Sequence, residues 1–252
     1  MTHYPFPDSR GTKIAFAAFF TAMLFLARDS MFTTAVIGFE KAQFLMLGVI
    51  CLLGVAFLIV NRRNLLKILK DRRMIVAGIA AAVLLLPMLV KRDWQLMYFS
   101  VLLCLLTAVL LSYCLTVREA AKYYVAILSL LGAYSVLAAY ILRIGVDSGA
   151  YAVPVFQNSM GFEFHNFFLS IVPDTYVKNR NFGIFREPGV YQFFLITALY
   201  LNNYEVEWKK PWQLWLVNGI LAATMVSTFA TGGVAEMGLL AIVLFFDKKW
   251  YR

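Results

Sequence analysis

The sequence predicts an all-α fold in which about eight transmembrane helices form one polytopic bundle. Of the 252 residues, 62% are hydrophobic and only 15% are charged, and the mean hydropathy is +0.73. Soluble domains carry about 25% charged residues, because charge has to cover their surface. The surface of this chain therefore faces an apolar medium. This excludes a soluble enzyme, a nucleic-acid-binding domain and a disordered linker despite the formal net charge of +9. We expect residues 1–252 to form a single integral membrane domain.

Long apolar runs separated by short charged segments define the predicted spans, since about 20 apolar residues cross a bilayer. Backbone polar groups have to be satisfied inside lipid, so each run is expected to be a helix. The first run, 14–27, continues as 30–39 beyond Arg28 and Asp29, and the last, 234–246, is short and contains Glu236. Charged residues such as Arg62, Arg73, Arg118, Lys122 and Lys210 separate the runs between them, and Pro188 begins the sixth. These runs are 42–60, 74–90, 94–117, 123–142, 188–204 and 212–228.

A secretory signal peptide is the alternative for the first run, because Arg10 and Lys13 precede its apolar residues. The segment 26–29 is a poor cleavage site, since it lacks the small-x-small pattern that signal peptidase requires. We therefore expect an uncleaved first helix.

The distribution of Lys and Arg predicts the orientation, because these residues are retained on the cytoplasmic side. With tails and loops assigned to alternate sides, the side of the N-terminus carries 15 of the 23 basic residues and the opposite side carries 8. Both termini are therefore expected in the cytoplasm, and residues 143–187 form one external loop before the sixth span. At about 45 residues this loop is the longest connection, and such connections often carry function. Six basic residues lie in the predicted cytoplasmic loop 62–73 and could bind phospholipid, but the topology accounts for them.

Metal and disulfide chemistry are not indicated by the sequence. Cys51, Cys104 and Cys114 all fall inside predicted spans, and the ten residues between the last two do not bring them to one helical face. Two histidines are too few for a His-based metal site. We expect neither a metal nor a cofactor.

The segment 179–191 carries the first functional pattern. Pro188 is well placed as the first residue of a helix, and Glu187 then occupies the cap position. The free N–H groups and the positive dipole end of this helix would face the outer headgroup level, where an anion can bind. Arg180 and Arg186 lie just before it, and guanidinium groups suit phosphate. The alternative is that both arginines only snorkel to lipid phosphates while Glu187 caps the helix.

A polar stripe marks the outer end of the next predicted helix. Thr224, Ser227, Thr228 and Thr231 follow helical spacing, Gly232-Gly233 are expected to turn the chain, and Glu236 comes within a turn of the last helix. Such stripes often only pack helices together. An ionisable residue at this depth usually lines a cavity or pairs with a cation, although Glu236 could simply be exposed at the interface.

Together these residues resemble a known family. The pattern Arg180-x-x-Gly183-x-Phe185-x-Glu187-Pro188-Gly189, opening a transmembrane helix after a long external loop, looks like the bacterial O-antigen and capsular polysaccharide polymerases of the Wzy type. The run 227–232 is similar to their Ser/Thr-rich hairpin, and the related O-antigen ligases share the wider architecture. The resemblance covers the whole chain in topology but only these two segments in residues.

The resemblance implies a metal-independent membrane glycosyltransferase at the outer face of the bacterial cytoplasmic membrane. A growing glycan would pass from undecaprenyl pyrophosphate to a sugar hydroxyl on a second lipid-linked repeat unit, in the synthesis of O-antigen, capsule or exopolysaccharide. The lipid-linked oligosaccharide and membrane lipid are the expected partners, and a chain-length regulator protein is a further candidate. No nucleic acid is expected.

The resemblance also implies roles for individual residues. Arg180 and Arg186 would stabilise the departing pyrophosphate, and Glu187 would be the general base, with Glu236, Glu163 and His165 as the next choices. The residues assigned to substrate binding come from both segments and the external loop: Arg180, Arg186, Gly189, Ser227, Thr228, Thr231, Glu236 and His165.

Two other classes stay open. A polytopic transporter or lipid-linked oligosaccharide flippase would share this composition, but it should carry polar residues along a path through several helix centres. Here the polar residues cluster near the predicted outer ends, which favours binding at the outer face. A catalytically incomplete fragment is the other alternative, since polymerases of this type usually have more spans, and it would need none of the site residues in particular.

The first prediction tests the orientation. With the three native cysteines replaced, a cysteine at Ser148 or Asn179 should react with a membrane-impermeant thiol reagent in intact cells or spheroplasts. A cysteine at Lys67 is the matched control and should react only after the membrane is broken. Labelling of position 148 or 179 only after lysis would overturn the orientation.

Overall fold

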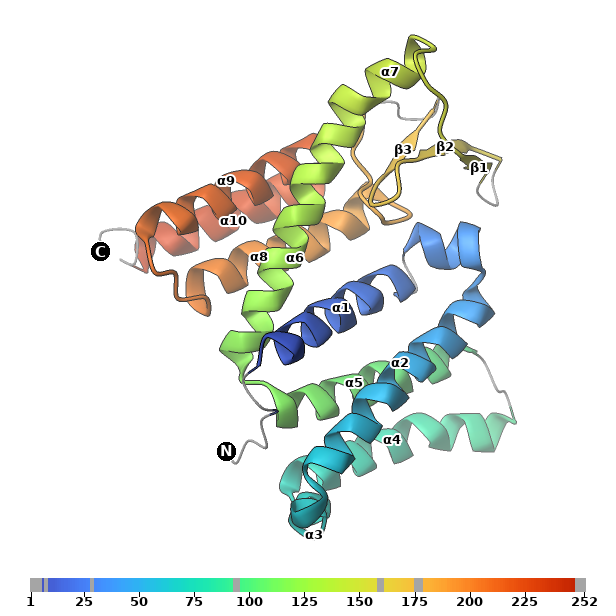
Figure 1. Ribbon diagram of the computed structural model, residues 1–252, viewed down its shortest axis with the longest axis vertical. Helices are drawn as coiled ribbons and strands as arrows, with labels where there is room; N and C mark the ends of the chain where they lie inside the picture. The colour runs from blue at the N-terminus through green and yellow to red at the C-terminus, as the bar shows by residue number, and fades with distance from the viewer. Residues whose placement is uncertain are drawn as a thin grey trace. The chain divides into compact units, whose positions relative to one another are not determined.

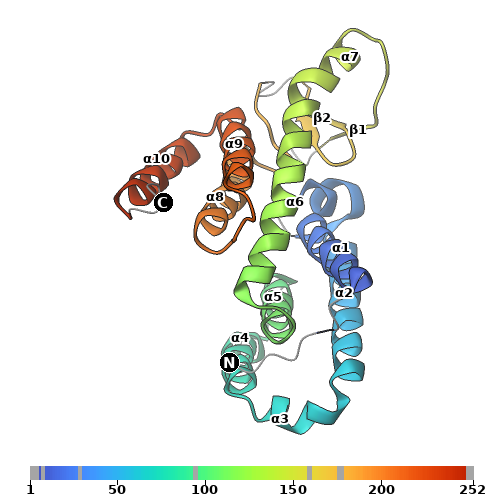
Figure 2. The same ribbon diagram turned by 60° about the vertical axis from the view of Figure 1, so that its left-hand side comes forward.

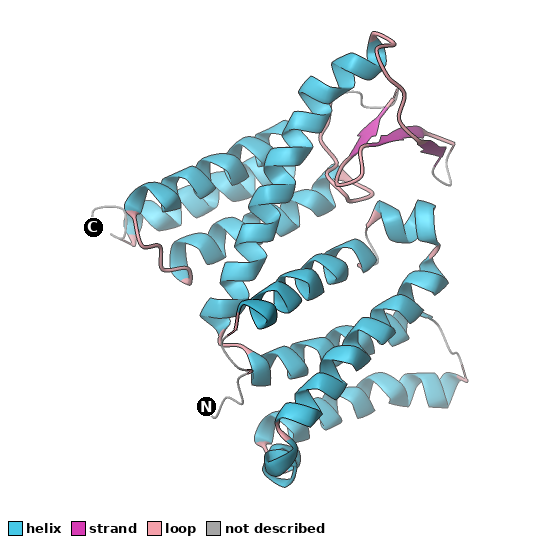
Figure 3. Ribbon diagram, viewed as in Figure 1, coloured by secondary structure: helices cyan, strands magenta, loops and turns pink. Residues whose placement is uncertain are grey.

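The computed structural model describes residue 6 and residues 9–27, 30–92, 96–157, 161–174 and 179–247. These residues are mostly helical (Figure 3) and fall into two compact units. The first unit comprises residues 1–28 and 39–120, and the second comprises residues 29–38 and 121–252. The single domain expected from the sequence stays a prediction.

The first unit consists of apolar helices (Figure 1), in which α1 packs on α2, and α5 packs on both α2 and α4. Side chains cap two of them: Ser9 Oγ accepts from Thr12 N at the start of α1, and Asp71 Oδ1 accepts from Arg73 N at the start of α4. These caps satisfy N–H groups that have no partner inside the helix. The helices are α1 (Arg10–Leu26), α2 (Phe39–Val60), α3 (Leu65–Leu69), α4 (Arg72–Lys91) and α5 (Leu96–Cys114).

The second unit is organised around one long helix and a group of three. α6 (Val117–Leu137) continues through a π-helical segment, η3 (Ala138–Leu142), into α7 (Arg143–Asp147). A second π-helical segment, η1 (Phe32–Ile37), belongs to this unit as well. Three further helices lie side by side in both views (Figures 1 and 2) and contact one another: α8 (Pro188–Tyr204), α9 (Pro211–Ser227) and α10 (Thr231–Phe246).

The expectation of an all-α fold is wrong in the predicted external loop, which contains a small antiparallel sheet. Its strands, in the spatial order β1-β2-β3, are β1 (Val155–Gln157), β2 (Glu163–Asn166) and β3 (Ile171–Pro173). Phe156 on β1 lies opposite Phe164 on β2, and the two rings stack at 5.8 Å. Phe164 and Ile171 are buried with Met31 in one apolar cluster. The sheet forms because it buries these side chains while pairing their backbone polar groups.

Three described helical segments are long and apolar enough to cross a membrane: Phe39–Val60, Arg72–Val90 and Val117–Asp147. They correspond to the predicted spans 42–60, 74–90 and 123–142, and the third continues one turn past its predicted end. The predicted runs 94–117, 188–204, 212–228 and 234–246 coincide with α5, α8, α9 and α10, and the run 14–27 coincides with α1. The continuation 30–39 is not part of α1, because it contains the separate segment η1. The count of eight spans stays a prediction. Trp94, the expected start of the fourth span, lies outside the described residues, as do Arg28 and Asp29.

α6 approaches α9 closely at Gly132. A Cβ at this position would lie 2.8 Å from Thr224 Oγ1, and Thr224 is fully buried. Glycine is required here because any larger residue would push the two helices apart.

We expect Gly132→Leu to destabilise the purified protein by about 1–3 kcal/mol, the usual cost of overpacking a buried contact. The measurement is thermal unfolding in detergent. Gly219→Leu on α9 is the matched control, because a Cβ at Gly219 has nothing within 4 Å. Equal melting temperatures for the two variants would contradict the close approach.

Candidate functional site

α8 begins at the residue that the sequence predicts. Pro188 is the first helical residue, and Glu187 precedes it with extended backbone angles (φ −143°, ψ 142°). The Glu187 side chain is exposed and makes no capping hydrogen bond. No acidic residue occurs in the first turn of α8 either, so its N–H groups lack the side-chain acceptor that usually covers a helix start.

The turn between α9 and α10 differs from the prediction. α9 ends at Ser227, and the chain reverses through Phe229, which has a φ of +49°, and Ala230. Gly232-Gly233, expected to form the turn, lie instead in the first turn of α10. As at the start of α8, the residue before α10, Ala230, supplies no side-chain cap and the first turn contains no acidic residue. Gly233 N–H in that turn differs, because it donates to Gln192 Oε1 on α8.

The polar stripe is divided between two elements. Thr224 and Ser227 are buried on α9, and Thr228 directly follows that helix and is fully buried. Thr231, expected as the fourth member of the stripe, is exposed and begins α10. The chain reversal at Phe229 breaks the helical spacing on which the prediction was based.

Asn181 fixes the segment before α8 to α6 and α9. Its Nδ2 donates to Ser135 Oγ at 2.8 Å and to Ser227 Oγ at 3.0 Å, and its backbone N–H donates to Ser227 O at 3.0 Å. Its Oδ1 accepts from Gly183 N at 2.9 Å. The side chain is 1% exposed, and both ends of its amide are satisfied. This network sets the position of Arg180, the preceding residue.

Gly183 is required in this segment for two reasons. Its φ is +56°, and a Cβ would lie 2.6 Å from the ring of Tyr191 on α8. The Tyr191 hydroxyl in turn shares a hydrogen bond of 3.1 Å with Ser135. The segment therefore packs directly on the first turn of α8, and only glycine fits.

Gln192 joins α8 to the α9–α10 turn. Its Nε2 donates to Thr228 Oγ1 at 2.6 Å and to Ala230 O at 2.7 Å, and its Oε1 accepts from Gly233 N at 2.7 Å. Gly233 lies so close that a Cβ would collide with the Gln192 amide. Gly233 is therefore explained by this approach and not by a turn.

These connections form a pocket of about 290 Å³ within the second unit. Arg180, Gly189 from the start of α8 and Thr231 from the start of α10 all line it, as do Gln192 and Glu236. The N-termini of both helices therefore open onto one pocket beside a guanidinium group. Each helix N-terminus carries about half a positive charge, so the arrangement favours an anion.

The pocket separates the predicted site residues into two groups. Arg180, Gly189, Thr231 and Glu236 line it, whereas Arg186 and Glu187 are not among the lining residues. All six residues are exposed, so the lining and not the burial separates them. Ser227 and Thr228 are buried in the hydrogen-bond network behind it.

His165 and Glu163 lie on β2, and neither lines this pocket. His165 Nε2 is 3.2 Å from Asp174 Oδ1, and its Nδ1 is buried. His165 therefore pairs within the sheet segment. Among the residues that the structure describes, no three His, Cys, Asp or Glu side chains gather closely enough to hold a metal ion.

Sequence reasoning missed the residues that build the pocket, above all Asn181, Gln192, Ser135 and Tyr191. A signal existed for Gln192, because an amide inside an otherwise apolar helix usually has a hydrogen-bond partner on another helix. The residues that Gln192 contacts could not be identified from the sequence.

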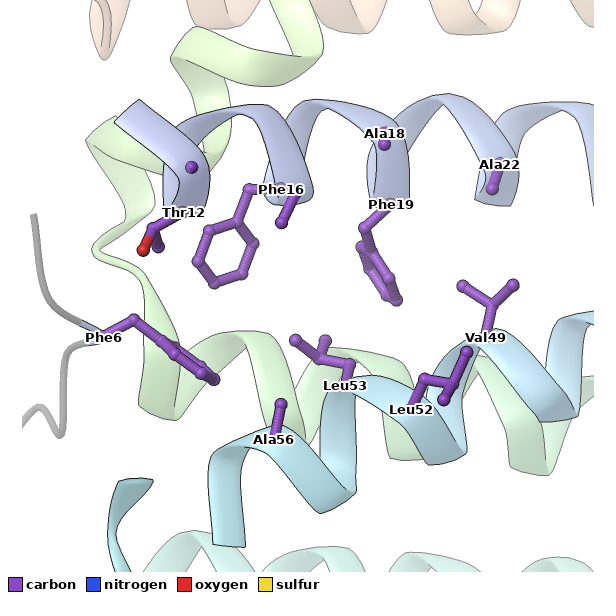
Figure 4. A pocket seen from close by; sticks show the side chains of 12 residues that line it. Phe6, Thr12, Phe16, Ala18, Phe19, Ala22, Val49, Leu52, Leu53 and Ala56 are labelled. Atoms are coloured by element: carbon purple, nitrogen blue, oxygen red, sulfur yellow. The ribbon is translucent and has the colours of Figure 1, made fainter. Parts of the chain in front are cut away.

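A larger pocket of about 530 Å³ lies in the first unit, between α1 and α2 (Figure 4). Phe16 and Phe19 point into it from α1, Leu52 and Leu53 line it from α2, and Phe6 lies at one end of it. Its lining contains no charged residue, so it offers no group for acid–base or anion chemistry.

Comparison with models of known protein families, with curated proteins and with solved structures finds no match for this chain. The geometry of the pocket is therefore the basis on which a function is inferred.

We expect Gln192→Leu to destabilise the purified protein by about 1–2 kcal/mol, because it leaves Gly233 N–H and Thr228 without their partner. Thr197→Val is the matched control on the same helix, since Thr197 Oγ1 bonds only its own helix, at Phe193 O. Thermal unfolding in detergent measures both. Equal melting temperatures for Gln192→Leu and Thr197→Val would show that Gln192 does not stabilise the α9–α10 turn.

Proposed function

We propose that this protein is a polysaccharide polymerase of the bacterial cytoplasmic membrane, which transfers a growing glycan from undecaprenyl pyrophosphate to a lipid-linked repeat unit at the outer face. The observation that supports this most is the convergence of Arg180 and the N-terminal turns of α8 and α10 on a pocket that also contains Glu236. A pyrophosphate leaving group and a sugar hydroxyl need such a combination of cationic and carboxylate groups.

The leaving group is the more demanding part of the reaction. When the bond between the anomeric carbon and the pyrophosphate oxygen breaks, negative charge develops on the departing diphosphate. Fixed donors aimed at that charge lower the barrier, and they act without a metal ion. Arg180 supplies a forked donor, and the backbone N–H groups of the lining residues Gly189 and Gly232 supply further ones. Gly233 N–H is not available, because it donates to Gln192 Oε1.

In this proposal Glu236 is the general base. The attacking sugar hydroxyl forms the new bond to the anomeric carbon and gives its proton to the Glu236 carboxylate. The sequence favoured Glu187 for this role, but only Glu236 lines the pocket with Arg180. Glu187 remains the second choice, because it lies two residues before the lining residue Gly189.

The size and walls of the pocket fit part of the substrate. Small-molecule pockets usually measure about 300–1,000 Å³, so 290 Å³ suits the diphosphate and its first sugar better than a whole repeat unit. Phe193 and Phe229 line the pocket and are largely exposed, which offers apolar surface to a sugar ring or to the start of the prenyl chain.

The position of the pocket supports a reaction at one membrane face. Its residues come from the start of α8, the segment after α9 and the start of α10, which meet at one end of the three-helix group. A flippase would need polar residues along the length of the helices. By the charge distribution of the sequence, this end is the outer one.

Arg180→Lys should lower the rate of transfer about a hundredfold or more, since the loss of a transition-state donor costs about 2–4 kcal/mol. Lysine keeps the charge but loses the planar fork. Arg186→Lys is the matched control from the same segment and should cost less than about tenfold, because Arg186 does not line the pocket. Polymer length in cells and transfer between lipid-linked repeat units in vitro are the measurements.

The same assay separates the two carboxylates. Glu236→Gln should abolish transfer at wild-type protein levels, and Glu187→Gln should retain most of it. If Glu187→Gln abolished transfer and Glu236→Gln retained most of it, Glu187 would be the base. Normal-length polymer from both Arg180→Lys and Glu236→Gln would contradict the assignment of this pocket as the active site.

A further inference from the structure

A groove in the first unit combines apolar walls with a charged end. It lies between α4 and α5 and has a volume of about 570 Å³. Val76 and Ala80 line it from α4 and Ala108 from α5, while Asp71, Arg72 and Arg73 form its end. α4 rises about 12 Å from Arg72 to Ala80, which is most of the depth of one leaflet, since the bilayer core is about 30 Å thick.

Arg73 holds this end of the groove together. Its guanidinium donates to Asp71 from Nε at 3.2 Å and from Nη2 at 3.1 Å, and from Nη1 to Ser112 O on α5 at 2.6 Å. It also lies 4.0 Å from the centre of the Tyr113 ring. The side-chain hydrogen bond from Arg73 holds the pKa of Asp71 below its ordinary value. The pair is therefore ionised and neutral overall at physiological pH, and it joins the start of α4 to the end of α5.

Arg72 supplies the net charge at this end of the groove. It is exposed, and the segment 62–73 around it carries six basic residues against one acidic residue, Asp71. Retention of the loop in the cytoplasm needs only those charges. It does not need an apolar groove that ends at one of them, so the topology leaves the groove unexplained.

We propose that the α4–α5 groove binds one anionic phospholipid of the cytoplasmic leaflet, with the lipid phosphate at Arg72 and one acyl chain along Val76, Ala80 and Ala108. The groove matches such a lipid in charge and in depth, since guanidinium groups bind phosphate through forked hydrogen bonds. This inference does not depend on the proposed function. The α1–α2 pocket of Figure 4 is similar in size but has no charged residue in its lining, which makes it the matched comparison.

The test measures lipid binding to the purified full-length chain in detergent by native mass spectrometry. The probes are phosphatidylglycerol and phosphatidylcholine with identical acyl chains. The wild type should prefer phosphatidylglycerol, and Arg72→Gln should weaken its binding about fivefold, the effect of one basic residue near an anionic headgroup. Arg63→Gln is the matched control from the same basic loop and should change the affinity less than about twofold.

Groove filling tests the acyl chain separately. Ala108→Leu should weaken phosphatidylglycerol binding at least fivefold, whereas Ala18→Leu, which fills the α1–α2 pocket, should leave it unchanged. Ala80→Leu replaces Ala108→Leu if the latter lowers the melting temperature. Equal losses from Arg72→Gln and Arg63→Gln would show that the whole basic loop attracts lipid without a defined site. Unchanged binding to the groove-filled variant, or displacement of the lipid by inorganic phosphate alone, would also overturn the proposal.

Discussion

The amide of Gln192 is the interaction on which the candidate site depends, because it connects α8 to the stretch 228–233, about 40 residues further along the chain. Its two ends contact Thr228, Ala230 and Gly233, and these contacts hold the α9–α10 turn against α8. They add directional contacts to the helix packing between α8 and α10, and so set the start of α10 beside Gln192. In an apolar environment an unpaired amide is costly, so the satisfied network favours this one arrangement over alternatives.

The second constraint is the positive electrostatic potential at the N-termini of α8 and α10. α1 and α4 begin with side-chain caps from Ser9 and Asp71, whereas Glu187 and Ala230 give no such cap to α8 and α10. In the first turn of α10, Gln192 Oε1 accepts from Gly233 N–H. Residues of both helix starts line the pocket to which Arg180 adds a full positive charge. A bound anion would complete both helices, which links the stability of the site to occupation by its substrate. This geometry supports the proposed polymerase activity, since a diphosphate has the charge and the oxygens to bind at both helix starts.

The positions of most helices and the start of α8 could be predicted from the sequence. Apolar length located the helices, and Pro188 fixed the start of α8, because both depend on local composition. The sheet was missed because its strands are only three or four residues long and their pairing is not local. Gly232-Gly233 were wrongly assigned to the turn, since glycine pairs usually signal turns, whereas Gly233 is needed for the approach of Gln192. The choice between Glu187 and Glu236 was not accessible either, because it depends on where a helix reverses.

The most direct measurement asks whether the lipid-linked glycan enters this pocket. A photoreactive benzoyl-phenylalanine in place of Phe193, which lines the pocket, should crosslink to undecaprenyl-pyrophosphate-linked repeat units in membranes. The same residue in place of Tyr200, exposed two turns further along α8, should not. A mass shift that carries the repeat unit at position 193 alone is the result we expect. Equal crosslinking at both positions, or none at 193 in active membranes, would contradict the assignment of this pocket as the substrate site.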